Sequence, residues 1–259
     1  MILPDPIGAG WGMSWILPAL GAILGLVAGS FLAALALRWP RGQSVMRGRS
    51  ACDACGHRLG AVDLLPVFGH LLRRGRCAYC GAPIDRRHLL IELACGGVGL
   101  VSLLAAPGLE GLCGAMFGWL LVALIALDVD HFWLPDELVA ALAVVGVGAG
   151  LAGIAPPMAD RLIGGLAGFA GLAVIAILYR VTRGRTGMGG GDPKLLGAIG
   201  LTLGWQALPL VLLGGASVGL ALLGVRRLRG DSIRADQEVP LGALMAVVAW
   251  PLWLVAAMA

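Results

Sequence analysis

The stretch Leu112–Asp128 reads LCGAMFGWLLVALIALD, an apolar run of 16 residues that ends on a carboxylate. Uncharged runs of this kind are typical of membrane helices, because a helix satisfies its own backbone polar groups in hydrocarbon. The whole 259-residue chain has the same character: 59% of its residues are hydrophobic and 13% are charged. Soluble domains carry about 25% charged residues. Since the apolar runs are unbroken rather than alternating, we expect an all-α polytopic membrane protein.

Turn signals and charges separate the apolar runs, which predict about eight transmembrane helices. The sixth is the least regular, since about a dozen residues fall short of the roughly 20 that cross a bilayer. By residue number, the predicted spans are about 14–37, 89–106, 112–127, 137–154, 162–179, 192–204, 208–225 and 239–257.

The arginines predict the orientation of these spans. Eight spans place the basic segments 38–88, 180–185 and 226–234 on one side of the membrane, together with the loop 128–136. Loops rich in arginine and lysine stay in the cytoplasm. We therefore expect the protein to lie in the lipid bilayer with this side facing the cytoplasm. The acidic residues at the ends of the spans on this side would face the cytoplasm too.

The segment between the first two spans contains two Cys-x-x-Cys pairs, each followed by glycine. Cys52 and Cys55 form the first pair, and Cys77 and Cys80 form the second. Two such turns can converge four thiolates on one ion, and four sulfurs in tetrahedral geometry favour a structural Zn²⁺ site. The alternatives are disulfides, which a cytoplasmic location disfavours, or free buried thiols.

This insert divides the chain into three predicted parts: a first transmembrane helix (1–37), a cytoplasmic zinc insert (38–88) and a transmembrane domain (89–259). His57 and His70 also lie in the insert, but four cysteines already complete a zinc site. The insert is basic, as nucleic-acid-binding ribbons are. Its arginines are also explained by the orientation rule, so we expect no nucleic acid as a partner.

Two acids at membrane edges are candidates for chemistry. Asp128 ends an apolar helix, where a carboxylate opposes the helix macrodipole and gains nothing as a cap; membrane acids usually mark function. Asp192 follows Gly189-Gly190-Gly191 and precedes Pro193 and Lys194. One interpretation makes Asp192 the N-cap of the sixth helix, with Pro193 at its first position. That interpretation leaves unexplained the glycines, which permit close backbone approach and positive φ, and the lysine.

Two carboxylates on one membrane face suggest an aspartic protease dyad. Acids held close together do not both ionise easily, so the pair shares a proton. The ionised partner then activates water, and the protonated partner polarises the scissile carbonyl. On this hypothesis Asp128 and Asp192 are catalytic.

Four motifs in order resemble the type IV prepilin peptidases, membrane aspartic proteases that also serve type II secretion. The similarity covers most of the chain and selects Asp128 over Asp130 as the first catalytic aspartate. The residues that carry it are Gly29-Ser30-Phe31-Leu32 with Arg38 and Pro40, the two Cys-x-x-Cys pairs, Asp128 with Pro135-Asp136, and Gly189-Gly190-Gly191-Asp192 with Lys194-Leu195-Leu196.

The resemblance implies that the protein lies in the bacterial inner membrane and removes the short basic leader of prepilins or pseudopilins at the cytoplasmic face. Gly189, Gly191 and Lys194 would support the two aspartates. In bifunctional members of the family, the resemblance also implies N-methylation of the new N-terminus with S-adenosylmethionine, and the large insert favours that second activity. The sequence does not locate a methyl-donor site; Glu92 is either an interfacial acid or a residue with a role there.

Two other hypotheses fit part of the pattern. A presenilin-type intramembrane aspartic protease shares the Gly-x-Gly-Asp motif, but it has neither the Leu134-Pro135-Asp136 context nor the zinc insert. A transporter would use Asp128, Asp192 and Lys194 as a proton or ion pathway and the zinc loop to bind a partner. Cleavage within a substrate's transmembrane span would favour the first, and transport without cleavage would favour the second.

Overall fold

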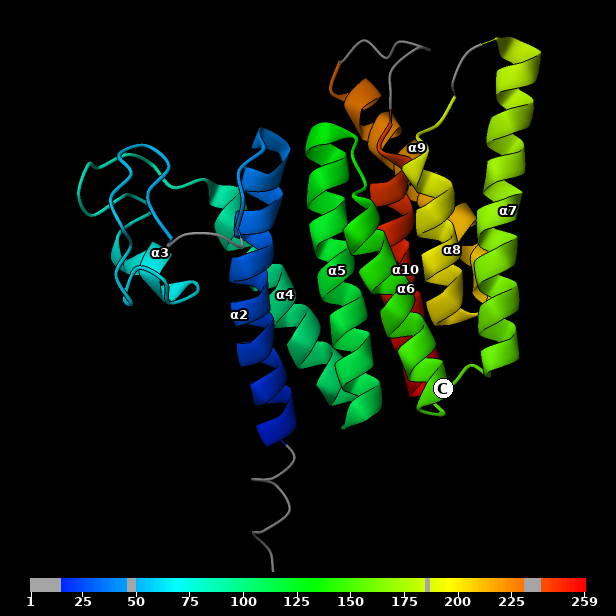
Figure 1. The fold of residues 1–259 in the computed structure, drawn as a ribbon, viewed down its shortest axis with the longest axis horizontal. Coiled ribbons are helices and arrows are strands. Elements are labelled where there is room, and N and C mark those ends of the chain that lie inside the picture. The colour runs from blue at the N-terminus through cyan, green and yellow to red at the C-terminus, as the bar shows by residue number, and fades with distance from the viewer. Residues whose placement is uncertain (1–14, 46–49, 185–186, 231–238) are drawn as a thin grey trace, which may run out of the picture. The chain divides into compact units, whose positions relative to one another are not determined.

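The structure is a computed structural model that describes residues 15–45, 50–184, 187–230 and 239–259. The described residues are built from helices, and their pairing of extended backbone is limited to two isolated bridges in the cysteine insert. The chain divides into two compact units, Met1–Trp119 and Leu120–Ala259. The prediction of an all-α chain is confirmed, and each unit is described by itself below (Figure 1).

The first unit contains α2 (Ile16–Arg38), which continues into the short helix η1 (Trp39–Arg41), then α3 (Phe68–Leu72), α4 (Arg86–Ala105) and the beginning of α5 (Leu109–His131). Its main contact is between α2 and α4. Glycines at positions 21, 25 and 29 present one smooth face of α2, as small residues do between membrane helices. A Cβ at Gly29 would lie 2.8 Å from Glu92 Cα, so the two backbones approach as closely as glycine allows.

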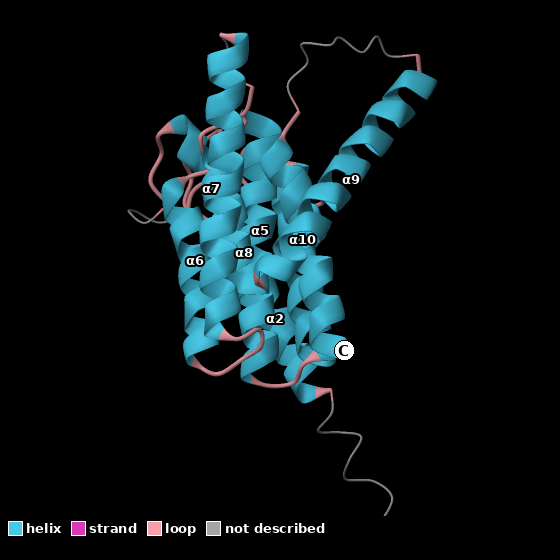
Figure 2. Ribbon diagram, turned by 90° about the vertical axis from the view of Figure 1, so that its right-hand side faces the viewer, coloured by secondary structure: helices cyan, strands magenta, loops and turns pink. Residues whose placement is uncertain are grey.

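The second unit contains the end of α5, α6 (Asp136–Leu151), α7 (Met158–Arg183), α8 (Gly191–Leu203), η2 (Trp205–Ala207), α9 (Leu208–Leu228) and α10 (Leu241–Met258). Within this unit α8 packs against α6, α7 and α10 (Figure 2). Most of its 13 residues are buried. A short helix with a charged start is therefore surrounded by protein, which removes the need for it to span the bilayer alone.

A buried arginine ties the far end of this unit together. Arg161, in the first turn of α7, is 1% exposed. Its guanidinium donates to the backbone carbonyls of Gly146, Leu201 and Thr202 at 2.7–3.1 Å. It also donates to three carbonyls of the preceding loop, residues 154–156. The charge thus satisfies free carbonyls in the last turn of α8 and in the loop after α6, and it adds a second donor to a carbonyl inside α6.

The eight predicted spans are found as helices, but eight membrane crossings are not confirmed. Six helices in the described residues are long and apolar enough to cross a membrane: those that include α2, α4, α5, α7, α9 and α10. By contrast, α6 has 16 residues and α8 has 13. One boundary was wrong in a way that matters: α5 continues to His131, so Asp128 lies inside its last turns rather than at its end.

Candidate active site and metal centre

Asp128 is held by the first turn of another helix. Its side chain is buried, with 5% of the residue exposed, and Oδ2 accepts a hydrogen bond of 2.7 Å from the backbone N–H of Ala243. Pro240 is the N-cap of α10, and the first amides of the helix after it have no intrahelical acceptors, as in any α-helix. The positive end of the α10 dipole therefore faces a carboxylate that its own helix dipole disfavours.

Asp192 lies in the first turn of α8, so the alternative interpretation of this residue as the N-cap does not hold. The N-cap is Gly190, and no side chain caps this end of the helix. Instead, Asp192 Oδ2 accepts a hydrogen bond of 3.1 Å from the N–H of Gly189 in the preceding loop. Asp192 is 6% exposed, so its carboxylate is turned into the protein rather than into solvent.

The second unit brings the two carboxylates together. The Asp128 carboxylate is close enough to act electrostatically on Asp192. The backbone amide of Gly242 lies within interaction range of both side chains. A Cβ at Gly242 would lie 3.0 Å from Asp128 Oδ2 and 2.7 Å from Leu134 Cδ1. Two acids from α5 and α8 thus share one patch of backbone at the start of α10.

Close packing, and not positive φ, explains the glycine at position 191. None of the glycines 189–191 is among the residues with positive φ. A Cβ on Gly191 would lie 2.8 Å from Leu134 Cβ, whereas one on Gly190 would meet nothing within 4 Å. Leu134 therefore packs against both Gly191 and Gly242, and it forms the apolar wall beside the two acids.

Lys194 pairs with a third acid. Its Nζ lies 2.7 Å from Asp136 Oδ1 and 2.9 Å from Oδ2. Asp136 is the first residue of α6. The ion pair is exposed, with 46% and 70% of the two side chains accessible, and it links the first turns of α6 and α8 outside the buried pair.

The four predicted metal ligands converge in the first unit. The Sγ atoms of Cys52, Cys55, Cys77 and Cys80 all lie within 4.8 Å of one another, and Cys52 Sγ is 3.9 Å from Cys80 Sγ. Tetrahedral Zn–S bonds of 2.3 Å place sulfurs about 3.8 Å apart. The four cysteines therefore fit a tetrahedral metal ion, and such an ion would join the two ends of the insert.

Two turns of the same form present these thiols. In one, Cys52 N donates to His57 O and Gly56 N donates to Cys52 O; in the other, Cys77 N donates to Ala82 O and Gly81 N donates to Cys77 O. Both glycines have φ near 70°, a conformation that glycine adopts without a Cβ penalty.

The cysteine turns also show how the backbone favours a thiolate. Backbone amides of Cys80 and Tyr79 lower the pKa of the Cys77 thiol to about 7. At Cys80 the Ala82 amide also favours the thiolate, but the neighbouring thiols and burial outweigh it and raise the pKa to about 11. Ligating sulfur must be deprotonated, so a bound cation would supply the remaining stabilisation. The His57 ring stacks on Tyr79 with centroids 3.3 Å apart, and the cluster of potential ligands in the insert consists of the four cysteines.

Sequence reasoning missed two contributors to the acid pair. The backbone amides of Gly242 and Ala243 hold the carboxylates, yet neither residue has a polar side chain that would mark it in the sequence. Pro240 was the available signal, because proline commonly precedes or begins a helix whose first amides are free. In the sequence Leu134 is only part of the Leu-Pro-Asp motif, because its packing role depends on tertiary contacts.

Comparison with known proteins agrees with this arrangement. Residues 23–106 match the bacterial peptidase A24 N-terminal domain, and residues 115–224 match the type IV leader peptidase family. No solved structure matches the chain.

Similar proteins share most of their length with this chain. A prepilin leader peptidase/N-methyltransferase of Aeromonas hydrophila is 36% identical over 208 residues, covering 80% of this chain and 71% of the relative. One from Burkholderia pseudomallei (strain 1026b) is 36% identical over 259 residues, with 88% and 82% covered. One from Pseudomonas aeruginosa is 33% identical over 255 residues, with 88% and 87% covered. The chain therefore belongs to the type IV leader peptidase family and is an enzyme of the peptidase class.

Proposed function

We propose that this protein is an aspartic endopeptidase that removes the short leader of type IV prepilins or type II pseudopilins, with Asp128 and Asp192 as its catalytic pair. The single observation that carries the proposal is the meeting of these two buried carboxylates at the Gly242 amide. The family's relatives are named for prepilin processing, which supplies the class of substrate.

The proposed mechanism of peptide hydrolysis requires that the two aspartates share one proton. The ionised carboxylate takes a proton from water, and the resulting hydroxide equivalent attacks the scissile carbonyl carbon. The protonated carboxylic acid donates a hydrogen bond to the carbonyl oxygen, where negative charge develops. Breakdown of the tetrahedral species breaks the C–N bond, and the departing amine receives the proton. Backbone amides of Gly189 and Ala243 hold the two side chains in register for these transfers.

The supporting residues act on position rather than on protons. Gly191 lets α8 approach Leu134, Gly189 supplies an amide to Asp192, and Lys194 joins α8 to α6 through Asp136. Each role fixes where the start of α8 lies, and Asp192 belongs to that turn.

The cysteine cluster takes a structural role in this proposal. Cys52, Cys55, Cys77 and Cys80 would hold Zn²⁺ with all four positions filled by protein, which leaves no open position for catalysis. The domain division of the proposal is a first membrane helix (1–37), a zinc insert (38–88) that orders itself around the metal, and a peptidase domain (89–259).

The proposal includes a second activity, N-methylation of the new N-terminus with S-adenosylmethionine. Its support is the paired name of the relatives and the match of residues 23–106 to the N-terminal domain of bacterial members. We place the protein in the bacterial inner membrane with the aspartates facing the cytoplasm, because the basic loops require that orientation.

The test is cleavage of a prepilin by the purified protein in lipid nanodiscs. Asp128→Asn and Asp192→Asn keep the size of each side chain and remove its charge, so cleavage should fall about 10³-fold or more in each. Asp130→Asn is the matched control, since Asp130 lies in the same turns of α5 and is exposed. Full cleavage by both variants, each with wild-type thermal stability, would refute the proposal.

A further inference from the structure

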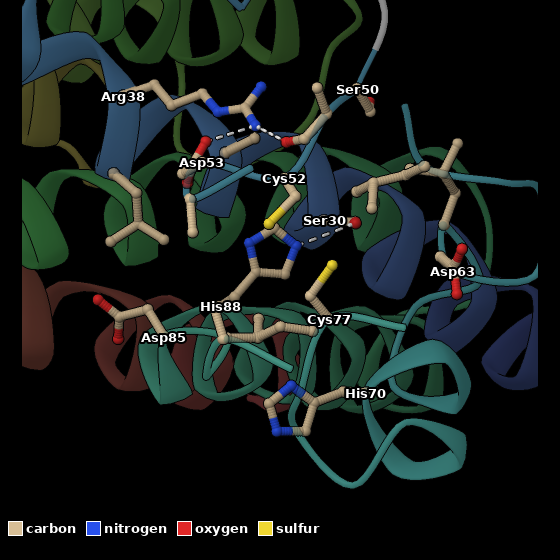
Figure 3. Close-up of a pocket in the computed structure, with 18 of the residues that line it drawn as sticks. Ser30, Arg38, Ser50, Cys52, Asp53, Asp63, His70, Cys77, Asp85 and His88 are labelled. Carbon is tan, nitrogen blue, oxygen red and sulfur yellow. Dashed lines mark hydrogen bonds and ion pairs between the residues drawn. The ribbon is translucent and has the colours of Figure 1, made fainter. Parts of the chain in front are cut away.

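The first unit contains a cavity of about 400 Å³ between the end of α2, the start of α4 and the cysteine insert (Figure 3). This volume lies in the range of small-molecule sites, roughly 300–1,000 Å³. Its apolar lining includes Ala34, Leu37, Leu59 and Ile84. The peptidase chemistry uses none of these residues, because both aspartates belong to the second unit.

The charged lining is dominated by acids. Four carboxylates line the cavity with one arginine and two histidines, Arg38, His70 and His88. Each acid has a cationic neighbour, but the partners of Asp63 and Asp85, Arg73 and Arg87, lie outside the lining. The lining itself therefore has more acids than cations, which favours a ligand that has positive charge and one anionic group. The four acids are Asp53, Asp63, Asp85 and Glu92.

Arg38 offers the anion contact. Its Nη2 donates to Ala51 O at 2.8 Å and to Asp53 Oδ1 at 2.9 Å. Within residues 15–45 and 50–184, no partner is recorded for Nη1 or Nε. A guanidinium held in this way still has donors for a carboxylate.

Buried Glu92 pairs with half-buried His88 beside Ser30. Glu92 is 3% exposed, and its Oε2 accepts from the N–H of Val67 at 2.8 Å. Its Oε1 lies 3.3 Å from His88 Nε2, which is also 3.5 Å from Ser30 Oγ. When Nε2 carries the hydrogen that faces Glu92, His88 Nδ1 is the acceptor nitrogen.

We propose that this cavity binds S-adenosylmethionine. Arg38 would take the methionine carboxylate, the acidic lining would attract the ammonium and sulfonium charges, and the apolar side chains would cover the adenine. The assignment rests on the proposed methyltransferase function and gives that activity a site. The fit is one of charge, volume and donor set, all of which are properties of this chain's own residues.

In the proposed methyl transfer, His88 accepts the proton that the substrate amine releases. The substrate amine attacks the methyl carbon, the C–S bond breaks with its electron pair moving to sulfur, and a neutral thioether leaves. The methylated nitrogen then loses its proton to His88 Nδ1, and the Glu92 carboxylate stabilises the resulting imidazolium.

Binding of S-adenosylmethionine to the full-length, zinc-loaded protein in nanodiscs tests the site without relying on turnover. Isothermal titration calorimetry should give a dissociation constant about 10- to 100-fold weaker for Arg38→Gln, the loss expected for a charge-assisted contact. Ala34→Phe fills the cavity without changing charge and should also weaken binding. Arg41→Gln removes an exposed arginine outside the lining and should bind as the wild type does. Zinc content reports whether each variant keeps the folded insert.

The outcomes separate this proposal from the proposed function. If both cavity variants bind S-adenosylmethionine as tightly as the wild type while the cleaved product is methylated, the methyl donor binds elsewhere and only the cavity assignment fails. If the wild type neither binds S-adenosylmethionine nor methylates its product, the methyltransferase proposal fails and takes the cavity assignment with it. Weaker binding of a basic leader peptide by the cavity variants, with unchanged S-adenosylmethionine affinity, would make the cavity a peptide cleft and overturn the assignment.

Discussion

Asp128 Oδ2 accepts a hydrogen bond of 2.7 Å from the backbone amide of Ala243, 115 residues further along the chain. This contact joins the last turns of α5 to the first turn of α10. It explains how a carboxylate is tolerated near the C-terminal end of a membrane helix, since a second helix supplies free amides and a positive dipole end. The start of α10 is therefore part of the acid site.

Substitution of Gly191 should impair the enzyme, whereas substitution of its neighbour should not. Gly191→Ala places a Cβ 2.8 Å from Leu134 Cβ, and overpacking of this kind costs about 1–3 kcal/mol. Cleavage assays and thermal unfolding should both show the loss. Gly190→Ala is the control, since its Cβ would meet nothing within 4 Å. Adding Leu134→Ala to Gly191→Ala should recover part of the stability; equal behaviour of the two single variants would exclude close packing as the reason for this glycine.

The Lys194–Asp136 ion pair should have a small effect on cleavage, and exchanging the two charges should preserve it. The pair is largely exposed, and exposed pairs contribute about 0.2–1 kcal/mol. Lys194→Met or Asp136→Asn should each slow cleavage by no more than about fivefold. The exchanged pair, Lys194→Asp with Asp136→Lys, should restore most of the rate. A loss of 100-fold in Lys194→Met that the exchange does not rescue would show that Lys194 takes part in chemistry.

Loss of Arg161 should destabilise the second unit. Its guanidinium donates to six backbone carbonyls, three in the loop 154–156, one in α6 and two in the last turn of α8, and buried acceptors left without donors cost about 1–3 kcal/mol each. Arg161→Met should therefore lower the unfolding free energy by about 3 kcal/mol or more, measured by denaturant or thermal unfolding in detergent. Arg180→Met, at the exposed end of the same helix, should change it little. Equal unfolding free energies of the two variants would contradict this role of Arg161.

Removal of zinc should loosen the insert before it affects cleavage. The cysteine cluster belongs to the first unit and the aspartates belong to the second, and structural zinc sites order the segment that supplies their ligands. Chelation, or Cys52→Ser, should raise hydrogen exchange across residues 50–84, while leader cleavage declines less and later. Cys113→Ser should keep the zinc content at one ion per chain. An insert that stays protected from exchange without metal would contradict this role.

The helices and the metal site could be predicted from local sequence, because hydrophobic runs and cysteine spacing are local properties. The other features of the site depend on packing between distant segments. The apolar runs predicted α2, α4, α5, α7, α9 and α10 because hydrophobicity is local to each segment. The Cys-x-x-Cys turns predicted the cluster because their spacing encodes the geometry.

Other features depend on contacts that no local pattern encodes. The buried position of α8 follows from the helices around it, and the ion pair of Lys194 with Asp136 joins residues 58 positions apart. The cavity beside Glu92 is formed by three separate segments, and its only local signal is an isolated acid at the start of a predicted span.

The most direct test of the central claim is mass spectrometry of the substrate's N-terminus after incubation with wild-type protein, Asp128→Asn and Asp192→Asn in nanodiscs with S-adenosylmethionine. The account predicts that the wild-type product lacks its basic leader, begins at the residue after a glycine and carries one methyl group. It predicts that both folded variants leave the precursor at full length. A mature N-terminus of the same mass from either folded variant would contradict the assignment of Asp128 and Asp192 as the catalytic pair.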